Sequence, residues 1–299
     1  PNGASEFSPF VEYGAKEAAS WLAAAIEYGW NELPTPLRQS IEVNATVPAV
    51  AAAEVPEVLA RFDGCRTAKV KVAERGQSLA DDIARVRAGR EAMGDDAIVR
   101  IDANGGWSVD EAVTALTALA EFDLDYAEQP CMEVAELVEV RRRLGTAAPL
   151  VRIAADESVR KAEDPLAVAR AGAADLLIVK AQPLGGIARA LEIIDAAGLP
   201  VVVSSALDTS VGIGMGLHLA AALPEGVLAG ACGLGTVALL SGDVTDRPLV
   251  AEHGEIGVRR AILSPEMIET YAAEPERERW WRERIAACHR LLSSTPANP

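Results

Sequence analysis

Short apolar runs alternate with longer amphipathic stretches along most of the chain. A short run rich in β-branched residues predicts a buried strand, and apolar residues spaced three and four apart predict a helix. The pattern predicts eight strands separated by seven helices. The expected strands are residues 41–50, 67–72, 97–104, 124–130, 151–158, 175–182, 199–207 and 227–235. The expected helices are residues 54–61, 78–93, 108–121, 134–144, 165–171, 187–197 and 211–223.

Regular alternation of strands and helices predicts a parallel α/β fold, because such strands pair through right-handed crossovers. Seven β/α units and a closing eighth strand favour a TIM-type barrel over residues 41–240. The alternative, an open doubly wound sheet, requires a glycine-rich phosphate turn after its first strand. The first expected strand, "IEVNATVPAV", is followed by no such turn, so the barrel is the favoured prediction.

The two ends of the chain do not follow the repeat. Residues 1–40 contain an expected helix, Ala15–Tyr28, and a proline-containing connector. Residues 241–299 contain short strand-like pieces and a charged helix, Pro275–Leu292. We expect both ends to join in an α+β cap over the barrel. The final residues, "SSTPANP", are expected to be disordered.

Composition restricts the possible partners. Of the 299 residues, 28 are Lys or Arg and 44 are Asp or Glu, so the net charge is −16. An acidic chain repels phosphate backbones, and nucleic acid is therefore not an expected partner. The apolar run Gly212–Leu240 is interrupted at Pro224, which predicts a buried helix and strand in place of a membrane span. Four cysteines without paired spacing and an N-terminus without a signal-peptide pattern predict a reducing, cytoplasmic setting.

Ionisable side chains occur at the ends of five consecutive expected strands. In "TAKVKV" the period of two places both lysines on one face, and in "VRIDAN" it places Arg100, Asp102 and Asn104 together. Because strands of a parallel barrel end at one rim, these groups are expected to meet there. Taken singly, each is more often a capping or solvated residue. The groups are, in chain order, Lys69 and Lys71, Asp102, Glu128, Asp156, and Lys180.

Three carboxylates brought to one rim repel each other, and a divalent cation would relieve that repulsion. Ligands that are all oxygen favour Mg²⁺ or Mn²⁺ over zinc. Glu157 follows Asp156 directly, so alternation allows only one of them to face inward, and we expect Glu157 to act as a supporting partner. No histidine stands at an expected strand end, and none is assigned to catalysis.

The motifs "FSPF", "TAKVKVAERGQS", "RIDANGGW", "YAEQPC", "IAADES", "VKAQPLGG" and "ACGLGT" resemble the enolase superfamily in order and spacing. Within it the chain is similar to the muconate-lactonizing subgroup, and most of all to its actinobacterial dehydratases that form o-succinylbenzoate. The likeness runs from about Ser5 to about Val258. It implies a modified TIM barrel with an α+β capping domain built from both termini. It also implies that residues 1–40 hold only part of the N-terminal half of that cap.

The resemblance also implies roles for individual residues. Asp102, Glu128 and Asp156 would bind Mg²⁺. Lys71 would be the acid and base, Lys69 would assist it electrostatically, and Lys180 would lie on the opposite face of the substrate. Contacts with the substrate are implied for Arg100, Asn104, Ser204, Ser205 and the Gly233 backbone.

The implied activity is that of a carbon–oxygen lyase acting on a small carboxylate. It would remove water in syn fashion from 2-succinyl-6-hydroxy-2,4-cyclohexadiene-1-carboxylate, giving o-succinylbenzoate for menaquinone biosynthesis. Racemisation of N-acylamino acids or epimerisation of dipeptides on the same scaffold is an alternative. Dipeptide epimerases typically carry Asp-x-Asp on the last barrel strand, where this chain has "CGLGT". A non-catalytic relative that retains the metal site is a further alternative.

Overall fold

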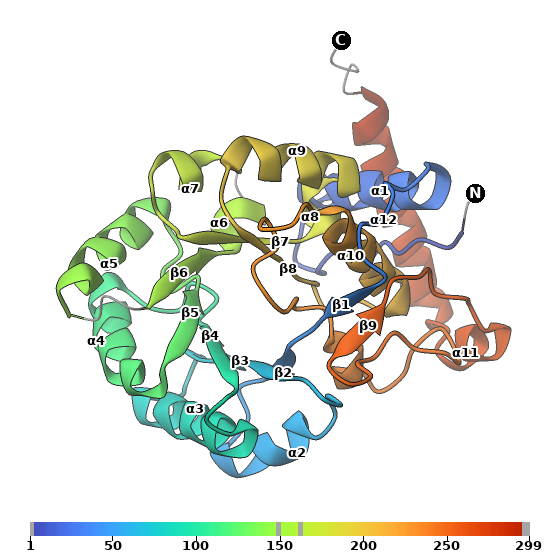
Figure 1. Cartoon of the computed structure of the whole chain (residues 1–299). Helices are drawn as coiled ribbons and strands as arrows, with labels where there is room; N and C mark the ends of the chain where they lie inside the picture. The colour runs from blue at the N-terminus through green and yellow to red at the C-terminus, as the bar shows by residue number, and fades with distance from the viewer. Residues whose placement is uncertain (1–2, 148–150, 161–163, 295–299) are drawn as a thin grey trace.

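A seven-stranded parallel sheet curls around a central axis and carries helices on its outer side (Figure 1). This computed structural model describes residues 3–147, 151–160 and 164–294. The strands are ordered β2 to β8 as they occur in the chain, so each pairs with its sequence neighbours. They are β2 (Ala45–Val47), β3 (Thr67–Lys71), β4 (Ile98–Asp102), β5 (Leu124–Glu128), β6 (Arg152–Ala155), β7 (Leu176–Val179) and β8 (Val201–Val203).

Helices follow each strand and cover the outside of the sheet, as the amphipathic pattern predicts. Two single-turn helices, α6 (Glu157–Arg160) and α8 (Ala181–Leu184), begin inside the stretches 151–158 and 175–182 that are expected to be strands. Both strands therefore end earlier than the sequence predicts. The helices of this layer are η1 (Ala52–Glu54), α2 (Val55–Leu59), α3 (Leu79–Met93), α4 (Val109–Leu119), η2 (Ala120–Phe122), α5 (Val134–Ala147), α6 (Glu157–Arg160), α7 (Ala167–Arg170), α8 (Ala181–Leu184), α9 (Ile187–Ala197), α10 (Ser210–Ala222) and η3 (Thr236–Leu239).

The expected closing strand, residues 227–235, is not a regular strand. It makes only isolated parallel bridges, among them Cys232 with Val43 and Gly233 with Ser204. Gly230 has a φ of +82°, a left-handed conformation that interrupts strand geometry. The segment still joins both edges of the sheet, because Gly233 N–H donates to the Val203 carbonyl in β8 and the Cys232 carbonyl accepts the N–H of Asn44, the residue directly before β2. The barrel is therefore closed by an irregular segment.

The prediction of one strand over residues 41–50 is wrong, because this stretch changes partner midway. Its first part, β1 (Ser40–Glu42), pairs antiparallel with β9 (Glu255–Gly257) in a separate two-stranded sheet. Val43 N–H donates to Gly254 O, and Asn44 N–H donates to Cys232 O. The chain then enters the barrel at β2.

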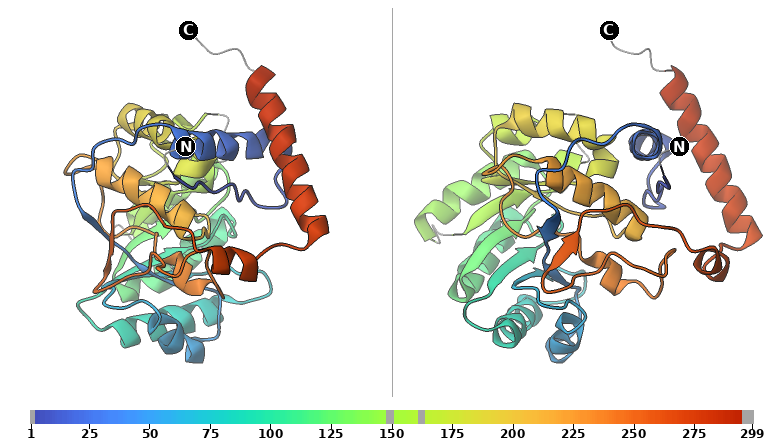
Figure 2. Two further views of the ribbon diagram at one scale, coloured as in Figure 1. Left: turned by 90° about the vertical axis from the view of Figure 1, so that its right-hand side faces the viewer. Right: turned by 45° about the vertical axis from the view of Figure 1, so that its right-hand side comes forward.

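The two ends of the chain lie side by side beyond the barrel (Figure 2). The predicted helices there are confirmed as α1 (Ala15–Trp30) and α12 (Pro275–Ser294), with α11 (Pro265–Thr270) before the second. Phe7 meets Trp281 edge-on at 5.9 Å, and Arg284 donates to the carbonyls of Pro9, Phe10 and Tyr13. Ser293 and Ser294 are helical, so disorder was wrongly predicted for them, whereas residues 295–299 lie outside the described part.

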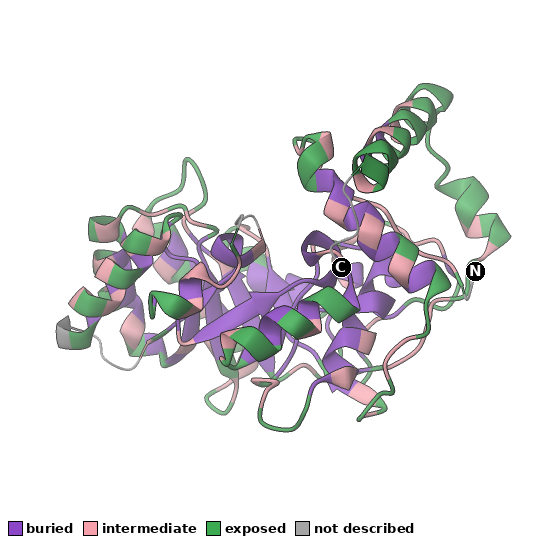
Figure 3. Cartoon of the chain, turned by 90° about the horizontal axis from the view of Figure 1, so that it is seen from above, coloured by how far each residue is buried: buried purple, intermediate pink, exposed green. Residues whose placement is uncertain are grey.

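The strands are buried, and the outer sides of the helices around them are exposed (Figure 3). The buried apolar residues of the barrel form two layers. The larger lies between the sheet and the outer helices, and it contains Val99, Ile101 and Ala103, the apolar face of β4 predicted by alternation. A small layer fills the barrel interior with Tyr126, Ala154, Leu176, Ile178 and Val202. In the described ranges, no helix combines the length and apolar character needed to cross a bilayer.

The start of α4 offers a local test of the fold. Ser108 Oγ accepts the Glu111 N–H, and Glu111 in turn accepts from the Ser108 N–H at 2.8 Å, which is the predicted capping box. We expect Ser108→Ala to lower the free energy of unfolding by about 1 kcal/mol. Thr117→Ala, which removes a hydroxyl bonded within the same helix, is the control and should cost less. Chemical denaturation of both variants measures the difference.

The same capping box should depend on pH. The backbone N–H and hydroxyl of Ser108 lower the pKa of Glu111 below its usual value. A depressed folded-state pKa contributes stability above the unfolded pKa, and this contribution is lost as the pH falls through the folded pKa. The stability difference between Ser108→Ala and the unchanged protein should therefore shrink in acid. A difference that stays constant from neutral pH to about pH 3 would contradict this account.

Candidate active site

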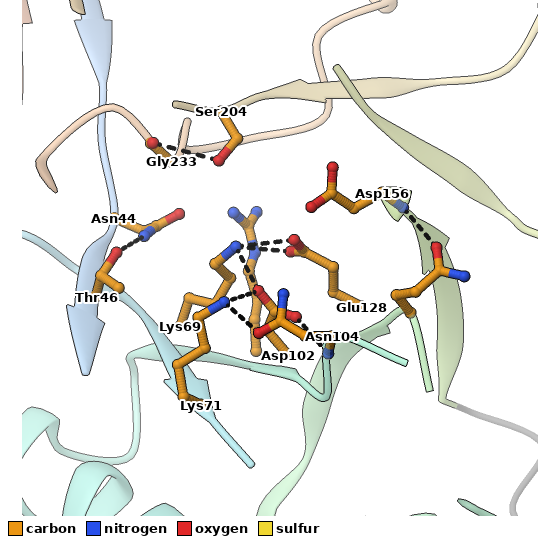
Figure 4. Close-up of polar contacts among 12 residues, drawn as sticks. Asn44, Thr46, Lys69, Lys71, Asp102, Asn104, Glu128, Asp156, Ser204 and Gly233 are labelled. Carbon is orange, nitrogen blue, oxygen red and sulfur yellow. Dashed lines mark hydrogen bonds and ion pairs between the residues drawn. The ribbon is translucent and has the colours of Figure 1, made fainter. Parts of the chain in front are cut away.

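Charged side chains form one row at the carboxyl ends of the barrel strands (Figure 4). The sheet register places Lys71 opposite Asp102, Asp102 opposite Glu128, and Glu128 opposite Ala154. Asp156 follows β6 two residues after Ala154, and Lys180 directly follows β7. The register thus brings together the ionisable residues predicted to meet at this rim.

Lys69 is the central cation of the row. Its Nζ donates to Asp102 Oδ2 at 3.1 Å and to both oxygens of Glu128 at 3.0 and 2.8 Å. Only 6% of Lys69 is exposed. Burial alone would lower the pKa of Lys69, but the charges of Asp102 and Glu128 raise it well above its usual value. Lys69 is therefore a fixed positive charge between two buried carboxylates.

Lys71 lies further out on the same strand face. Its Nζ donates to Asp102 Oδ2 at 2.5 Å and to Asn104 Oδ1 at 2.7 Å. Its side chain is 29% exposed, so it is the most open of the three lysines at the rim. Asn104, at a φ of +46°, also donates its amide to Glu157 Oε1 at 3.1 Å. Asn104 thus links Lys71 to the start of α6.

On the other side of the row, Lys180 is ion-paired to Asp156 Oδ2. Arg160, which sequence analysis did not identify, donates to Asp156 Oδ1 at 3.2 Å and to Glu157 Oε1 at 2.7 Å. It also donates to the Tyr13 hydroxyl at 2.5 Å, so the N-terminal segment reaches the site through this guanidinium. Arg160 stands four residues after Asp156, a spacing that brings two side chains together on a helical turn, and this spacing was the signal in the sequence for the pair.

The three carboxylates differ strongly in proton affinity. Burial and then the charge of Asp102 raise the pKa of Glu128 to about 8, although Lys69 opposes them. Burial would also raise the pKa values of the two aspartates, but cations reverse this. Lys69 and Lys71 hold the pKa of Asp102 well below its usual range, and Lys180 and Arg160 lower that of Asp156. The neighbouring cations therefore do not fully offset the cost of burying a negative charge on Glu128.

This donor set fits a hard divalent cation in its chemistry. All three predicted ligands are carboxylates at adjacent strand ends, each at most 1% exposed. Their side chains are not gathered into a cage: within residues 3–147, 151–160 and 164–294, no three His, Cys, Asp or Glu side chains are arranged around a common metal position. Lys69 lies between Asp102 and Glu128 instead, and Lys180 is paired to Asp156. Metal binding by Asp102, Glu128 and Asp156 stays a prediction that requires these ion pairs to rearrange.

The predicted substrate residues after β8 do come together. Ser205 Oγ donates to Gly233 O at 3.1 Å, Ser204 Oγ contacts the same carbonyl at 3.4 Å, and both serines are buried. A Cβ at Gly233 would be only 2.5 Å from Ser204 Oγ, so this close approach requires glycine. Their contact with a substrate stays a prediction.

Arg100 lies deeper in the barrel and is 1% exposed. Its guanidinium donates to Asp125 Oδ2 at 2.9 Å and to the carbonyl of Ala231 in the closing segment at 2.6 Å, and it stacks over Tyr126 at 4.7 Å. These bonds give Arg100 a structural part in joining β4 to the segment that closes the barrel. These bonds do not test the predicted contact between Arg100 and the substrate, which stays a prediction.

Gln129 organises the strand ends and was not identified as a site residue. Its Oε1 accepts the N–H groups of Asp156 and Ser158 at 2.9 and 3.2 Å. Its Nε2 donates to Cys131 O and to the Ser158 hydroxyl. The residue has a φ of +40°, an unfavourable conformation for a side chain of this size, which these bonds offset. Gln129 therefore fixes the backbone from which Asp156 projects.

Comparison with known proteins agrees with this architecture. A family model described as "Enolase C-terminal domain-like" matches residues 50–262, and one described as "Enolase N-terminal domain-like" matches residues 1–29. Among solved structures, a muconate lactonizing enzyme from Pseudomonas fluorescens has a TM-score of 0.71 at 25% identity, covering 87% of this chain and 74% of the other. The L-Ala-D/L-Glu epimerase from Bacillus subtilis has a TM-score of 0.68 at 28% identity, covering 81% and 70%.

Sequence relatives specify the family further. The o-succinylbenzoate synthase of Mycolicibacterium smegmatis is 55% identical over 98% of this chain and 88% of its own length. The o-succinylbenzoate synthase of Mycobacterium tuberculosis is 55% identical, and that of Mycobacterium marinum 52% identical, each over 98% of this chain and 86% of the relative. The chain therefore belongs to the o-succinylbenzoate synthase family of the enolase superfamily.

Proposed function

We propose that the protein converts 2-succinyl-6-hydroxy-2,4-cyclohexadiene-1-carboxylate to o-succinylbenzoate, a dehydration step of menaquinone biosynthesis. The observation that carries the proposal is the row of Lys71, Asp102 and Glu128 in register, with Lys180 and Asp156 completing it. Relatives that are 52–55% identical and named o-succinylbenzoate synthase support the choice of reaction.

Lys71 is the proposed acid and base. As a neutral amine, its Nζ would take the proton from the ring carbon next to the substrate carboxylate. The resulting ammonium would return that proton to the departing hydroxyl on the same face, so that C–H and C–O bonds break, a ring double bond forms and water leaves. The partial exposure of Lys71 supports this role, because its Nζ must reach both positions.

Other residues would support charge development. Asp102, Glu128 and Asp156 would hold a divalent metal, proposed to be Mg²⁺, which supplies electrostatic stabilisation to the negative charge that forms on the substrate carboxylate. Asp102 is ion-paired to Lys71 in this structure, and a metal held by Asp102 would compete with Lys71 for this carboxylate. Lys180 would remain a cation against the opposite face of the ring. Ser204, Ser205 and the Gly233 backbone would contact the succinyl chain.

Lysine substitutions test the catalytic assignment. We expect Lys71→Ala and Lys180→Ala each to reduce kcat by about 10²- to 10⁴-fold, the usual contribution of acid–base and charge-stabilising groups. The matched control is Lys16→Ala, an exposed lysine on α1, which should retain the activity of the unchanged protein. A spectrophotometric dehydration assay, with circular dichroism to verify folding, measures the effect. Folded variants of Lys71 or Lys180 with undiminished turnover would refute the assignment.

Metal removal tests the carboxylate assignment separately. EDTA should abolish turnover and Mg²⁺ should restore it, because the charge on the substrate carboxylate would otherwise lack its counter-ion. Mg²⁺ should also raise the melting temperature of the unchanged protein, since a ligand that binds only the folded state stabilises it. Glu128→Gln should lose most of this thermal shift. Turnover that is indifferent to chelation would exclude the metal role.

Racemisation of an N-acylamino acid is a second candidate, favoured by the fold similarity to the L-Ala-D/L-Glu epimerase and by lysines at the ends of two separate strands. Both reactions begin with proton removal next to a carboxylate. Incubation of an N-succinylamino acid in D₂O discriminates them. Mass spectrometry that detects deuterium at the α-carbon would show the racemase activity. No deuterium incorporation in a protein that dehydrates its substrate rapidly would restrict the protein to the lyase reaction.

A further inference from the structure

A buried pair of opposite charges lies on α3, the helix that follows β3. Asp82 is 2% exposed and Arg85 is 1% exposed, and Arg85 Nη1 donates to Asp82 Oδ1 at 3.0 Å. The two residues share the buried face of the helix with Val86 and Gly89. Replacing a buried ion pair by apolar side chains is often neutral or stabilising, so stability alone is a weak reason for this pair. Its contacts with the backbone are therefore informative.

The pair bonds to the backbone at the end of β3. Arg85 Nη1 also donates to the Lys71 carbonyl at 2.9 Å, and the Ala73 N–H donates to Asp82 Oδ2 at 3.0 Å. Arg85 Nε donates to the Val50 carbonyl at 2.6 Å. The pair thus joins the last residue of β3, the turn that follows it and the chain that leaves β2.

These bonds take the place of a strand that has ended. Val72 N–H donates to the Asp102 carbonyl on the β4 side. Because the C=O and N–H of a trans peptide point in opposite directions, the Lys71 carbonyl faces the side of β2. The strand β2 ends directly before Pro48, which has no N–H to donate. Arg85 therefore supplies the partner that β2 does not provide to this carbonyl.

The turn after β3 combines an unfavourable conformation with an adjoining cavity. Ala73 has a φ of +59°, in the left-handed region that residues with a Cβ rarely adopt. A cavity of about 530 Å³ is lined by residues 73–79 and by Trp107 and Asp110 at the start of α4. Residues in such conformations persist when their surroundings fix them. The bond from the Ala73 N–H to Asp82 is one such constraint.

The side-chain contacts of Lys71 suit its charged form. Its Nζ donates to Asp102 Oδ2 and to Asn104 Oδ1. The proposed reaction requires a neutral amine, which loses the charge attraction of Asp102. The Lys71 carbonyl and the Ala73 N–H carry no charge, so their bonds to the pair on α3 persist when the amine loses its proton. The pair can therefore hold the base in both protonation states.

We propose that Asp82 and Arg85 position Lys71 for proton transfer by fixing the backbone on both sides of Val72. The inference rests on the acid–base role proposed above for Lys71. Asp82 and Arg85 are positioning residues, since they would act on the substrate only through the backbone that carries Lys71.

A double variant tests the inference without leaving a buried charge unpaired. Asp82→Leu combined with Arg85→Met removes both charges and keeps similar side-chain sizes. We expect kcat to fall about 10- to 100-fold with little change in KM, because the base is misplaced while the substrate contacts remain. The melting temperature should change little, since an ion pair is replaced by apolar side chains. An unchanged kcat in the folded double variant would overturn the inference.

Arg85→Lys is a second variant for the case that the double variant does not fold. It retains a positive charge beside Asp82 but lacks the planar fork that reaches the carbonyls of Val50 and Lys71 together. We expect kcat to fall about 3- to 10-fold, again with little change in KM. A folded Arg85→Lys variant with the kcat of the unchanged protein would contradict the positioning role.

The matched control is Arg90→Met, on the same helix. Arg90 also donates to backbone carbonyls, those of Ala97, Phe122 and Asp123, which directly precede β4 and β5 at the opposite end of the barrel. This variant should lower the melting temperature and leave kcat unchanged. Equal losses of kcat in Arg90→Met and in the double variant would show a general loosening of α3 and would overturn the inference.

Crystal structures of the unchanged protein and the double variant give a readout that does not depend on turnover. We expect the Arg85 bond to the Lys71 carbonyl in the first, and a displacement of Lys71 Nζ by about 1 Å in the second. If the unchanged protein does not dehydrate the proposed substrate, the proposed function fails, and this displacement still decides the inference. The same position of Lys71 in both structures would overturn it.

Discussion

The ion network around Lys69 is the interaction on which the rest of the site depends. Three carboxylates are held in the low-dielectric end of a barrel, where ionised groups are stable only when opposite charges lie within a few ångströms. Lys69 contacts two of them at once, and Lys180 with Arg160 serves the third. Removing one partner from a buried pair typically costs about 3–5 kcal/mol, so each of these cations stabilises the fold, whatever part it takes in chemistry.

Backbone geometry around the rim delivers these charges to one place. Parallel register aligns the ends of β3, β4 and β5, with Lys71 opposite Asp102 and Asp102 opposite Glu128, although the pairing of β4 with β5 shifts by one residue between Val99 and Ile101. Gln129 then fixes the turn into α6 by accepting the N–H groups of Asp156 and Ser158 while donating to the Cys131 carbonyl. The N-terminal segment adds two polar contacts of its own, from Tyr13 to Arg160 and from Glu6 to the start of α10. Chain segments far from the barrel in sequence therefore support the residues at its mouth.

Membership in the o-succinylbenzoate synthase family gives this arrangement its chemical interpretation. Proton removal next to a carboxylate requires a base that can reach the substrate and nearby charges that stabilise the product. The partly exposed Lys71, the buried Lys69 and the carboxylates beside them are suited to these tasks. A lactonizing enzyme and an epimerase have similar folds, so the fold alone does not specify the reaction, and we expect the choice to depend on the groups proposed to contact the rest of the substrate. In this protein the proposed substrate contacts after β8 are small residues, Ser204, Ser205 and Gly233. Gly233 packs so closely against Ser204 that a larger side chain would not fit at position 233.

Sequence alone determined much of this protein. Alternation in "TAKVKV" and "VRIDAN" was sufficient to assign the inward face of each strand, because the side-chain period of a strand is two whatever its partner. Repetition of strand and helix was sufficient to predict parallel pairing and a common rim. These features are local, or follow from short connections, so they can be read from neighbouring residues.

Only the tertiary structure decided the features that depend on distant partners. The exchange of partners at Val43 results from contacts with Cys232 and Gly254, more than 150 residues later in the chain. The closing segment bonds through isolated bridges to this stretch and to β8, and no local pattern encodes these contacts. The same holds for the bond from Arg160 to Tyr13 and for the small cavity lined by Gln182 and Asp208, whereas the pair of Arg160 with Asp156 lies within one helical turn. Ion pairs and cavities are set by distance and direction in three dimensions, and a linear sequence specifies these only through the whole fold.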